Sequence, residues 1–140
     1  MRSDDALSVR AARATKGYAP VPTAPRTIIC VGRNPEILRR RQEMISSQLS
    51  LAVHSVTPEE ADAWSARTEP RLWVFCHTVE LPRLAYLACR VLRFSPESRL
   101  ILLEGDQRIG FESSLFHLVL RPSDGVKRFL DAVSALSAAA

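Results

Sequence analysis

The stretch Arg71-Leu72-Trp73-Val74-Phe75-Cys76-His77 decides the fold of this chain. Five apolar residues follow one another between a charged residue and a polar His-Thr pair. A run this short that is apolar on both faces is typical of a strand covered by helices on both sides, as at the centre of a parallel sheet. We therefore predict the middle strand over residues 71–76. Ligands bind beyond the carboxyl ends of the strands in such sheets, so Cys76 and its neighbours are the first positions to consider.

Strand and helix patterns alternate on both sides of this stretch. Asn34-Pro35-Glu36 supplies an N-cap, a proline at the first helical position and an acid in the first turn. Arg41 falls near the apolar stripe of that helix, and we expect its charged head to reach water by snorkelling. The predicted elements are strand 27–31, helix 35–48, strand 51–55, a short helix from the capping box at 57–60 that ends before Pro70, strand 71–76, helix 80–94, strands 99–103 and 115–120, and a helix from Ser123 to the Ala-rich end.

Only residues 104–114 separate the last two predicted strands. This is too short for a full helix with two loops, so the fourth helix of the alternating series is predicted to be shortened or missing. We place Leu81 and Val126 on the core-facing stripes of the last two helices. The alternation predicts a parallel α/β sheet with right-handed crossovers.

Residues 1–25 differ in composition from the rest of the chain. They end in Ala-Pro-Val-Pro-Thr-Ala-Pro, which cannot form a helix and has nothing to bury. We interpret them as a flexible basic tail, and residues 26–140 as one domain. Most of the formal charge of +4 comes from residues before Thr27. The basic balance therefore describes a tail, either an electrostatic tether or a non-functional extension, and makes nucleic acid an improbable partner.

The cysteines and the hydropathy pattern indicate a reduced, aqueous compartment. Cys30, Cys76 and Cys89 fall in or beside predicted core elements, and no CxxC or Cys/His ligand spacing occurs. The N-terminus has no apolar signal region, and no run approaches the ~20 apolar residues of a membrane span. We expect a cytoplasmic protein with reduced thiols, no metal and no cofactor.

From about Arg26 to Ala140 the chain resembles the receiver domain of bacterial two-component response regulators. Residues 28–37, Ile-Ile-Cys-Val-Gly-Arg-Asn-Pro-Glu-Ile, are similar to the family's first strand, acidic loop and Pro-Glu-Ile helix start. Residues 118–122, Leu-Val-Leu-Arg-Pro, are similar to its fifth strand ending in Lys-Pro. The resemblance implies a flavodoxin-like five-stranded parallel sheet with strand order 2-1-3-4-5.

The resemblance also implies which positions would carry phosphoryl-transfer chemistry. The family uses two acids after the first strand to hold Mg²⁺, and these positions fall on Gly32 and Arg33. Its aspartate acceptor falls on Cys76, its hydroxyl residue on Glu104 and its lysine on Arg121. The metal neutralises charge on the transferring phosphoryl group and needs hard oxygen ligands. We therefore expect a degenerate receiver pocket in which aspartyl phosphorylation at Cys76 is impossible.

Two of these positions offer a replacement interaction. Glu104 and Arg121 would end adjacent strands, and we hypothesise that they form an ion pair that fills the vacated pocket and locks the domain in one state, with Arg33 nearby. The alternative for each residue is a solvated surface charge.

The function expected from these features is a stand-alone pseudo-receiver that takes part in phosphorelay signal transduction through protein contacts and is not an enzyme. No output domain follows in this sequence, so its effect would pass through a signalling protein or a second copy of the chain. Ile109, Phe111, Leu115 and Phe116 are candidate contacts, because a missing fourth helix would expose strands four and five. Packing of these residues in the core or a loop is the alternative.

A second hypothesis is a small enzyme or thiol redox sensor that uses Cys76, since the basic neighbour His77 could lower the pKa of a thiol. Against this, neighbouring residues on a strand point to opposite faces. His54 and His117 have no carboxylate at ligand spacing, and we interpret them as buried or edge histidines. The run of arginines at 39–41 is interpreted as a solvated helix face, because no interleaved aromatic residues support binding to nucleic acid.

Overall fold

The computed structural model describes residues 27–105 and 115–138, so the predicted tail and the candidate contacts Ile109 and Phe111 lie outside the described residues. Five parallel strands form one sheet in the order β2-β1-β3-β4-β5. This confirms the predicted flavodoxin-like, receiver-like fold. The elements are β1 (Thr27–Val31), α1 (Pro35–Leu49), β2 (Ala52–Val56), α2 (Pro58–Ser65), β3 (Leu72–Phe75), α3 (Leu81–Phe94), β4 (Arg99–Leu103), β5 (Leu118–Leu120), a 3₁₀ turn (Pro122–Asp124) and α4 (Gly125–Ala138).

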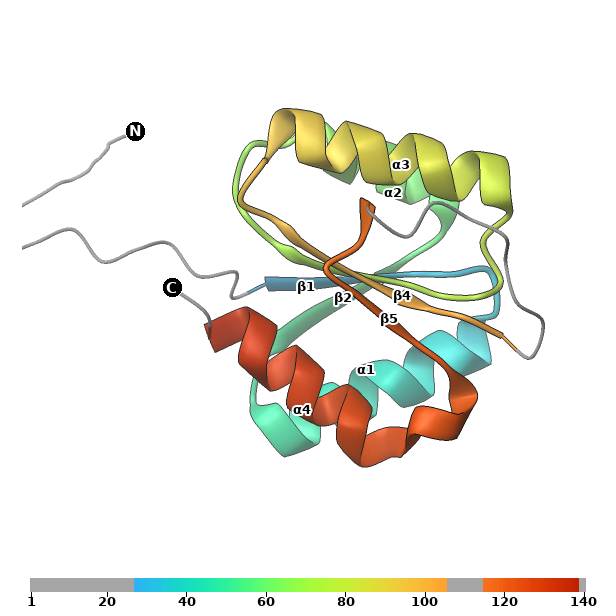
Figure 1. The fold of residues 1–140 in the computed structure, drawn as a ribbon, viewed down its shortest axis with the longest axis vertical. Coiled ribbons are helices and arrows are strands. Elements are labelled where there is room, and N and C mark those ends of the chain that lie inside the picture. The colour runs from blue at the N-terminus through green and yellow to red at the C-terminus, as the bar shows by residue number, and fades with distance from the viewer. Residues whose placement is uncertain (1–26, 106–114, 139–140) are drawn as a thin grey trace, which may run out of the picture.

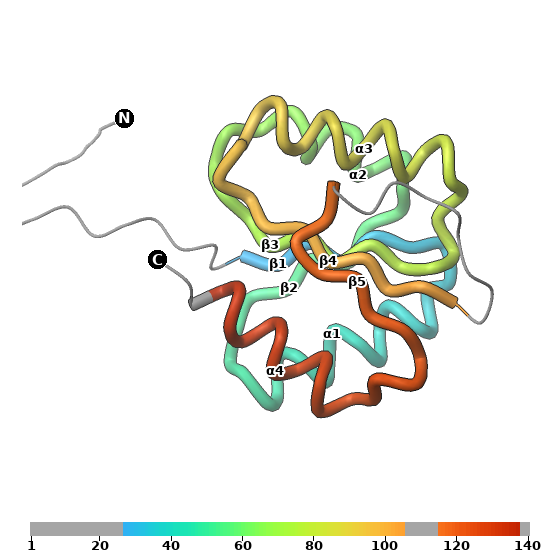
Figure 2. The backbone as a smooth tube through the Cα atoms, in the orientation of Figure 1, coloured from blue at the N-terminus to red at the C-terminus, as the bar shows by residue number. Residues whose placement is uncertain are grey.

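The sheet lies between two helical layers, with α2 and α3 on one face and α1 and α4 on the other (Figure 1). The backbone trace shows the same arrangement, with the twisted strands between the two pairs of helices (Figure 2). All four residues of β3 are buried, as predicted for the middle strand. Successive strand residues alternate between two core clusters, of which the first contains Ile29, Val31, Trp73, Phe75, Leu100 and Leu102, and the second Ile28, Cys30, Leu72, Val74 and Ile101.

The predicted capping signals start both of the first two helices. The Asn34 side chain accepts hydrogen bonds from the amides of Glu36 and Ile37, at 3.0 and 3.2 Å. Thr57 and Glu60 form the reciprocal capping box of α2, with bonds of 2.8 and 3.1 Å. Each cap places the start of its helix beside the carboxyl end of the preceding strand, which is the edge where the candidate site lies.

Strand β5 is shorter than predicted, because it begins at Leu118 rather than at Leu115. Phe116 leaves the sheet and packs edge-on against Phe75, with 5.9 Å between ring centroids. His117 then pairs with β4 in an unusual way. Its amide donates to the Leu100 carbonyl at 2.8 Å, and its ring Nδ1 accepts from the Leu100 amide at 3.0 Å. The apolar run therefore supplies core packing in its first half and strand pairing only in its second half.

The predicted core positions of Leu81 and Val126 are wrong. Leu81 and Val126 are 42% and 58% exposed, because each lies in the first turn of its helix, at the edge of the sheet rather than over its face. Arg41 is half-buried, and its Nη1 atom is shielded from solvent, so not all of the guanidinium reaches water as the expected snorkelling would have it. Arg41 packs near the Phe129 ring of α4, with its guanidinium carbon 6.0 Å from the ring centroid.

Within residues 27–105 and 115–138, none of the helices combines the length and apolar character that crossing a bilayer requires.

Candidate functional site

The five predicted pocket positions lie at the carboxyl edge of the sheet. Gly32 and Arg33 follow β1, Cys76 follows β3, Glu104 follows β4 and Arg121 follows β5. Because all the strands are parallel, these positions share one edge. Their side chains make two separate sets of polar contacts, one around Arg33 and one between Glu104 and Arg121.

Gly32 lies in close contact with the loop after β3. The Cys76 amide donates to the Val31 carbonyl at 2.8 Å, which draws the two loops together. A Cβ atom on Gly32 would lie 3.0 Å from the Cys76 Cβ and 3.2 Å from the Thr78 hydroxyl oxygen. These distances are tighter than most real Cβ contacts, so a side chain at position 32 would require its neighbours to shift by a few tenths of an ångström.

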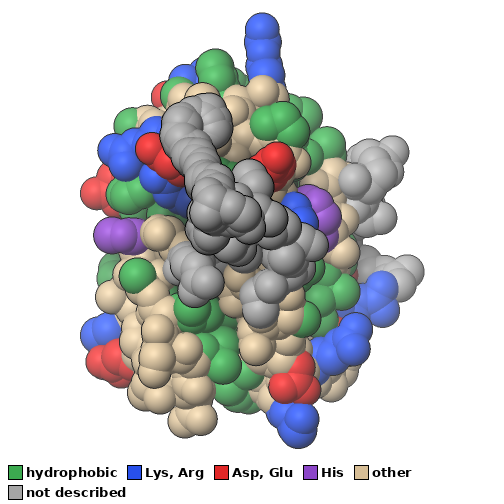
Figure 3. Space-filling view, turned by 90° about the vertical axis from the view of Figure 1, so that its left-hand side faces the viewer, with side chains coloured by type: hydrophobic (Ala, Val, Ile, Leu, Met, Phe, Trp, Pro, Cys, Tyr) green, Lys and Arg blue, Asp and Glu red, His purple; other side chains and the backbone are tan. Residues whose placement is uncertain are grey.

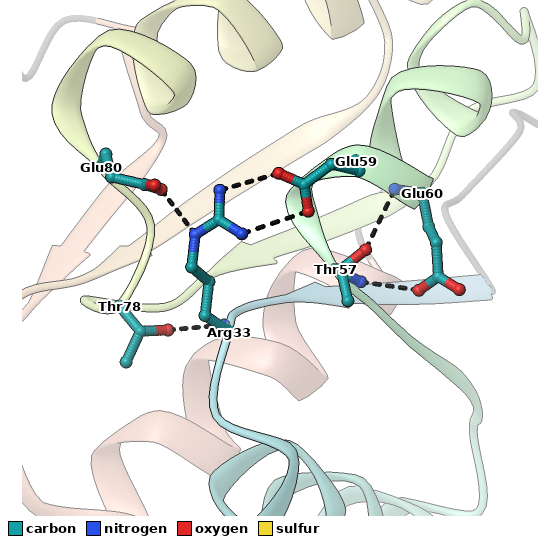
Figure 4. Close-up of polar contacts among 6 residues, drawn as sticks. All are labelled: Arg33, Thr57, Glu59, Glu60, Thr78 and Glu80. Atoms are coloured by element: carbon teal, nitrogen blue, oxygen red, sulfur yellow. Dashed lines mark hydrogen bonds and ion pairs between the residues drawn. The ribbon is translucent and has the colours of Figure 1, made fainter.

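Arg33 connects three loops at this edge (Figure 4). Its two terminal nitrogens donate to the two carboxylate oxygens of Glu59 at 3.1 and 2.9 Å, the bidentate geometry typical of arginine. Its Nε donates to Glu80 at 2.8 Å, and its amide donates to the Thr78 hydroxyl at 2.8 Å. The guanidinium therefore joins the loop after β1 to the first turn of α2 and to the N-cap of α3.

The charges of this network stabilise one another. The hydrogen bonds from Arg33 hold the pKa of the Glu59 and Glu80 carboxyls below their usual range, and the two carboxylates in turn raise the pKa of Arg33. The Arg33 side chain is 37% exposed, and those of Glu59 and Glu80 are more exposed, so water and salt weaken the interactions. We call Arg33, Glu59, Glu80 and Thr78 the Arg33 network.

Sequence reasoning missed three members of the Arg33 network. Thr78 and Glu80 lie in the loop after β3, and Glu59 lies in the first turn after β2. The available signal was their position, because residues that follow parallel strands meet at one edge. The Arg33 side chain, expected near Glu104 and Arg121, donates from all three guanidinium nitrogens to Glu59 and Glu80 and so belongs to this separate set of contacts.

Glu104 and Arg121 form the hypothesised ion pair between β4 and β5. The Arg121 Nε donates to the Glu104 Oε1 at 3.3 Å. The Glu104 side chain is only 10% exposed, whereas that of Arg121 is 50% exposed. The Arg121 amide also donates to the Asp124 carboxylate at 2.7 Å, which fixes the turn that leads into α4. The carboxylate is therefore nearly enclosed and depends on the arginine for its compensation.

Cys76 is buried, and its sulfur lies 3.6 Å from Nδ1 of the exposed His77. The expectation that these two side chains point apart is wrong, because β3 ends at Phe75 and strand alternation does not extend to residues 76 and 77. The burial of Cys76 nonetheless limits access to the thiol. Cys30 is also buried, which raises the pKa of its thiol to about 12. Cys89 is exposed on α3.

The remaining candidate residues have ordinary structural contacts. Arg39 and Arg40 bind Glu36, and Arg39 also binds Glu43, which is the solvated helix face that the sequence suggested. Phe116 is buried in the core, so packing describes it and a surface contact does not, while Leu115 is partly buried against the same cluster. Among the residues that the structure describes, no group of three or more His, Cys, Asp or Glu side chains could hold a metal ion.

Comparisons with known proteins extend the fold assignment. No family model and no curated protein matches the sequence. The chain is similar in structure to an adenylate cyclase from Rhodopirellula baltica, with a TM-score of 0.67 and 16% identity over 79% of this chain and 86% of that chain. It is also similar to the signal receiver domain of an HD-domain-containing protein from Pseudomonas fluorescens Pf-5, with a TM-score of 0.62 and 19% identity over 85% and 90% of the two chains.

A third similar structure is a pilus assembly-related protein from Burkholderia pseudomallei K96243, with a TM-score of 0.59 and 13% identity over 86% of this chain and 96% of that chain. At these identities each likeness shows the fold alone. The fold is therefore receiver-like, and function must be argued from the residues at the carboxyl edge of the sheet.

Proposed function

We propose that this chain is a receiver-like signalling domain that is not phosphorylated, is not an enzyme and acts through contacts with a partner protein in bacterial signal transduction. The fold supports the signalling class, since one of the similar structures is a signal receiver domain. The partner is a signalling protein or a second copy of the chain.

The Arg33 network is the observation that carries the proposal. Transfer of a phosphoryl group to an aspartate needs a carboxylate acceptor and a divalent cation held by oxygen ligands. In the place of the acidic pair stand Gly32, where a side chain would crowd Cys76 and Thr78, and Arg33, whose positive charge is held there by Glu59 and Glu80. A fixed guanidinium opposes the binding of a divalent cation by charge repulsion.

The position of the acceptor supports the same conclusion. Cys76 ends the strand that would carry the aspartate, and its side chain is buried beside Gly32. A thiol has no carboxylate oxygen, so Cys76 cannot accept a phosphoryl group from an acyl phosphate or a phosphorylated imidazole as the aspartate of a receiver domain does. The burial of Cys76 also gives no support to the alternative of a thiol enzyme or redox sensor.

The face that can be inspected gives no support to a nucleic-acid surface. On the side of the molecule shown in Figure 3, basic side chains lie beside acidic ones at several places. A surface that binds phosphate backbones gathers basic residues on one face or along one groove. Contacts with proteins are the better-supported means of action.

Nuclear magnetic resonance tests the proposal directly. The ¹⁵N-labelled chain is titrated with Mg²⁺, then with beryllofluoride and with acetyl phosphate, beside a receiver domain that keeps its acidic pair and acceptor aspartate. We expect the amides of residues 31–33, 76–80 and 104–105 to keep their chemical shifts, while those of the control domain move. Saturable shifts of these amides, or a mass increase of one phosphoryl group, would contradict the proposal.

A further inference from the structure

A cavity of about 460 Å³ opens between α1, α4 and the carboxyl ends of β4 and β5. The two helices lie side by side under this face of the sheet (Figure 1). This volume is within the range of small-molecule sites, which are largely apolar with a few converging polar groups. Its apolar walls are formed mainly by Met44, Leu103, Leu120 and Phe129.

The charged and titratable side chains that line this cavity are Arg41, His77, Glu104 and Arg121. Glu104 is compensated by Arg121 through the 3.3 Å ion pair. The positive charge of Arg41 is therefore left in excess. A cavity with apolar walls and one uncompensated cation favours a ligand that has an apolar body and one negative charge.

Arg41 is the strongest sign of a ligand. Its Nη1 atom is shielded from solvent and has no hydrogen-bond partner among residues 27–105 and 115–138. A buried donor on a charged group is costly to leave unpaired. The nearby Phe129 ring contacts the guanidinium but cannot accept a strong hydrogen bond from it. An anionic oxygen in the cavity, which Arg41 lines, would neutralise the charge, and a rotation of the guanidinium toward it would give this nitrogen an acceptor.

A second hollow beside Gly32 lacks these properties. It is lined by Arg33 and Arg39 among others. Arg33 is paired with Glu59 and Glu80, and Arg39 with Glu36 and Glu43, so neither cation is left without an acid. Of these two hollows, only the cavity between α1 and α4 is lined by an arginine that has no acid partner among the residues that the structure describes.

We propose that the cavity between α1 and α4 binds a small amphipathic organic anion, with its carboxylate or phosphate head group against Arg41 and its apolar body against Met44 and Phe129. This site goes beyond the proposed signalling function and does not depend on it, because no phosphoryl transfer and no partner protein is involved. The domain would then be a receptor for a small organic acid with an apolar chain.

Titration of the ¹⁵N-labelled full chain with decanoate, below its micelle concentration, tests the site. Decanol and decyltrimethylammonium have the same chain length without the negative charge, and acetate has the charge without the apolar chain. We expect decanoate to shift the amides of residues 41–45, 103–105 and 125–129, and to bind at least about tenfold more tightly than the other three probes. Equal binding of decanoate and decanol, or decanoate shifts confined to other residues, would overturn the proposal.

Two matched variants locate the head group. Arg41→Gln is expected to weaken decanoate binding about tenfold, whereas Arg40→Gln, which alters an exposed arginine on the same helix, is expected to leave it unchanged within about twofold. An unchanged affinity in Arg41→Gln would overturn the assignment. If Arg41→Gln fails to fold, Arg41→Lys, which keeps a cation, is compared with Arg40→Lys. Independently of either variant, equal affinity of the unmodified chain for decanoate and decanol decides against the site. The beryllofluoride titration is independent, so failure of one proposal leaves the other standing.

Discussion

Arg33 stands where the receiver resemblance implies an acid, and its neighbours Glu59 and Glu80 have the complementary charges. Four hydrogen bonds run from this residue to Thr78, Glu59 and Glu80. Each contact crosses from one loop to another, so Arg33 links the loops that follow β1, β2 and β3. The resemblance predicted which residue stands at the position, but only the structure shows which way its side chain turns.

Arg33→Gln should therefore lower the free energy of unfolding, more at about 0.05 M NaCl than at about 0.5 M, because salt screens exposed ion pairs. The pKa of Glu59 and Glu80 is lower in the folded chain than the ordinary 4.5, so their contribution is fully present above that pH and is lost as the pH falls through the lower folded values. Urea unfolding of both chains at about pH 7 and about pH 3 measures this difference. Arg93→Gln, at an exposed position on α3 outside the network, is the control. A difference that is the same at both pH values would contradict the argument.

The three cysteines should react in the order of their exposure. Cys89 is exposed, while Cys76 and Cys30 are buried, and burial raises the pKa of the Cys30 thiol to about 12. Because the thiolate is the nucleophile, iodoacetamide at about pH 7.5 is expected to modify Cys89 at least about tenfold faster than the other two. Peptide mass spectrometry over time gives the rates. Modification of Cys76 as fast as that of Cys89 would revive the hypothesis of a thiol enzyme.

Among the elements, those whose local signals agree with their burial were predictable from the sequence. β1 and β4 have the predicted bounds, and α2 begins at the predicted capping box. β5 is shorter than predicted, because an apolar run does not reveal which of its residues pair with the neighbouring strand and which pack in the core. Phe116 is used for packing against Phe75, and this contact depends on residues distant in the chain.

The ion pair between the ends of β4 and β5 should respond unequally to removal of its two members. Arg121→Gln leaves the nearly enclosed Glu104 carboxylate without its cation and is expected to cost about 1–3 kcal/mol. Glu104→Gln leaves a half-exposed arginine that water can solvate, and should cost less. Urea unfolding of the two variants, with Arg128→Gln as an exposed control on α4, measures both values. Changes within about 0.5 kcal/mol for both variants would remove the hypothesis that the pair locks the domain.

His117 should make the β4–β5 edge sensitive to pH. Partial desolvation of the otherwise exposed His117 ring, and to a lesser degree the charge of Arg99, lowers its pKa below 6.5, and the neutral ring is the form that accepts from the Leu100 amide. This contribution is present above about pH 6.5 and is lost as the pH falls toward the lower folded value. His117→Gln should therefore reduce the loss of stability between about pH 7.5 and about pH 5, as measured by urea unfolding. His54→Gln, at an exposed position on β2, is the control.

At the scale of the whole molecule, the layered architecture was predictable, whereas of the site only the edge of the sheet and the Glu104–Arg121 ion pair were. Runs that are apolar on both faces, alternating with amphipathic helices, specify a covered parallel sheet whatever the details of the contacts. The site depends instead on side-chain directions in loops, where neither strand nor helix periodicity applies. For this reason the sequence did not reveal the contacts of Arg33 with Glu59 and Glu80, or that of the Cys76 sulfur with the His77 ring.

The predicted division of the chain makes a further expectation at this scale. If residues 1–25 are a tail and residues 26–140 hold the whole core, deletion of residues 1–25 should leave the free energy of unfolding unchanged within about 0.5 kcal/mol. Urea unfolding of the shortened and full chains tests this, with near-ultraviolet circular dichroism as a check on core packing. A loss of cooperativity or a larger change would show that the first residues belong to the domain.

The ring of His117 accepts the hydrogen bond from the Leu100 amide that a peptide carbonyl accepts in an ordinary β-ladder. This affects how the length of the last strand can change between related chains. Where one imidazole completes the pairing, the outermost strand can lose backbone length while its neighbour keeps a full set of partners. We expect a related chain without an imidazole or carboxamide at this site to have a longer final strand. In such a chain a backbone carbonyl of the longer strand would accept the hydrogen bond that the His117 ring accepts here.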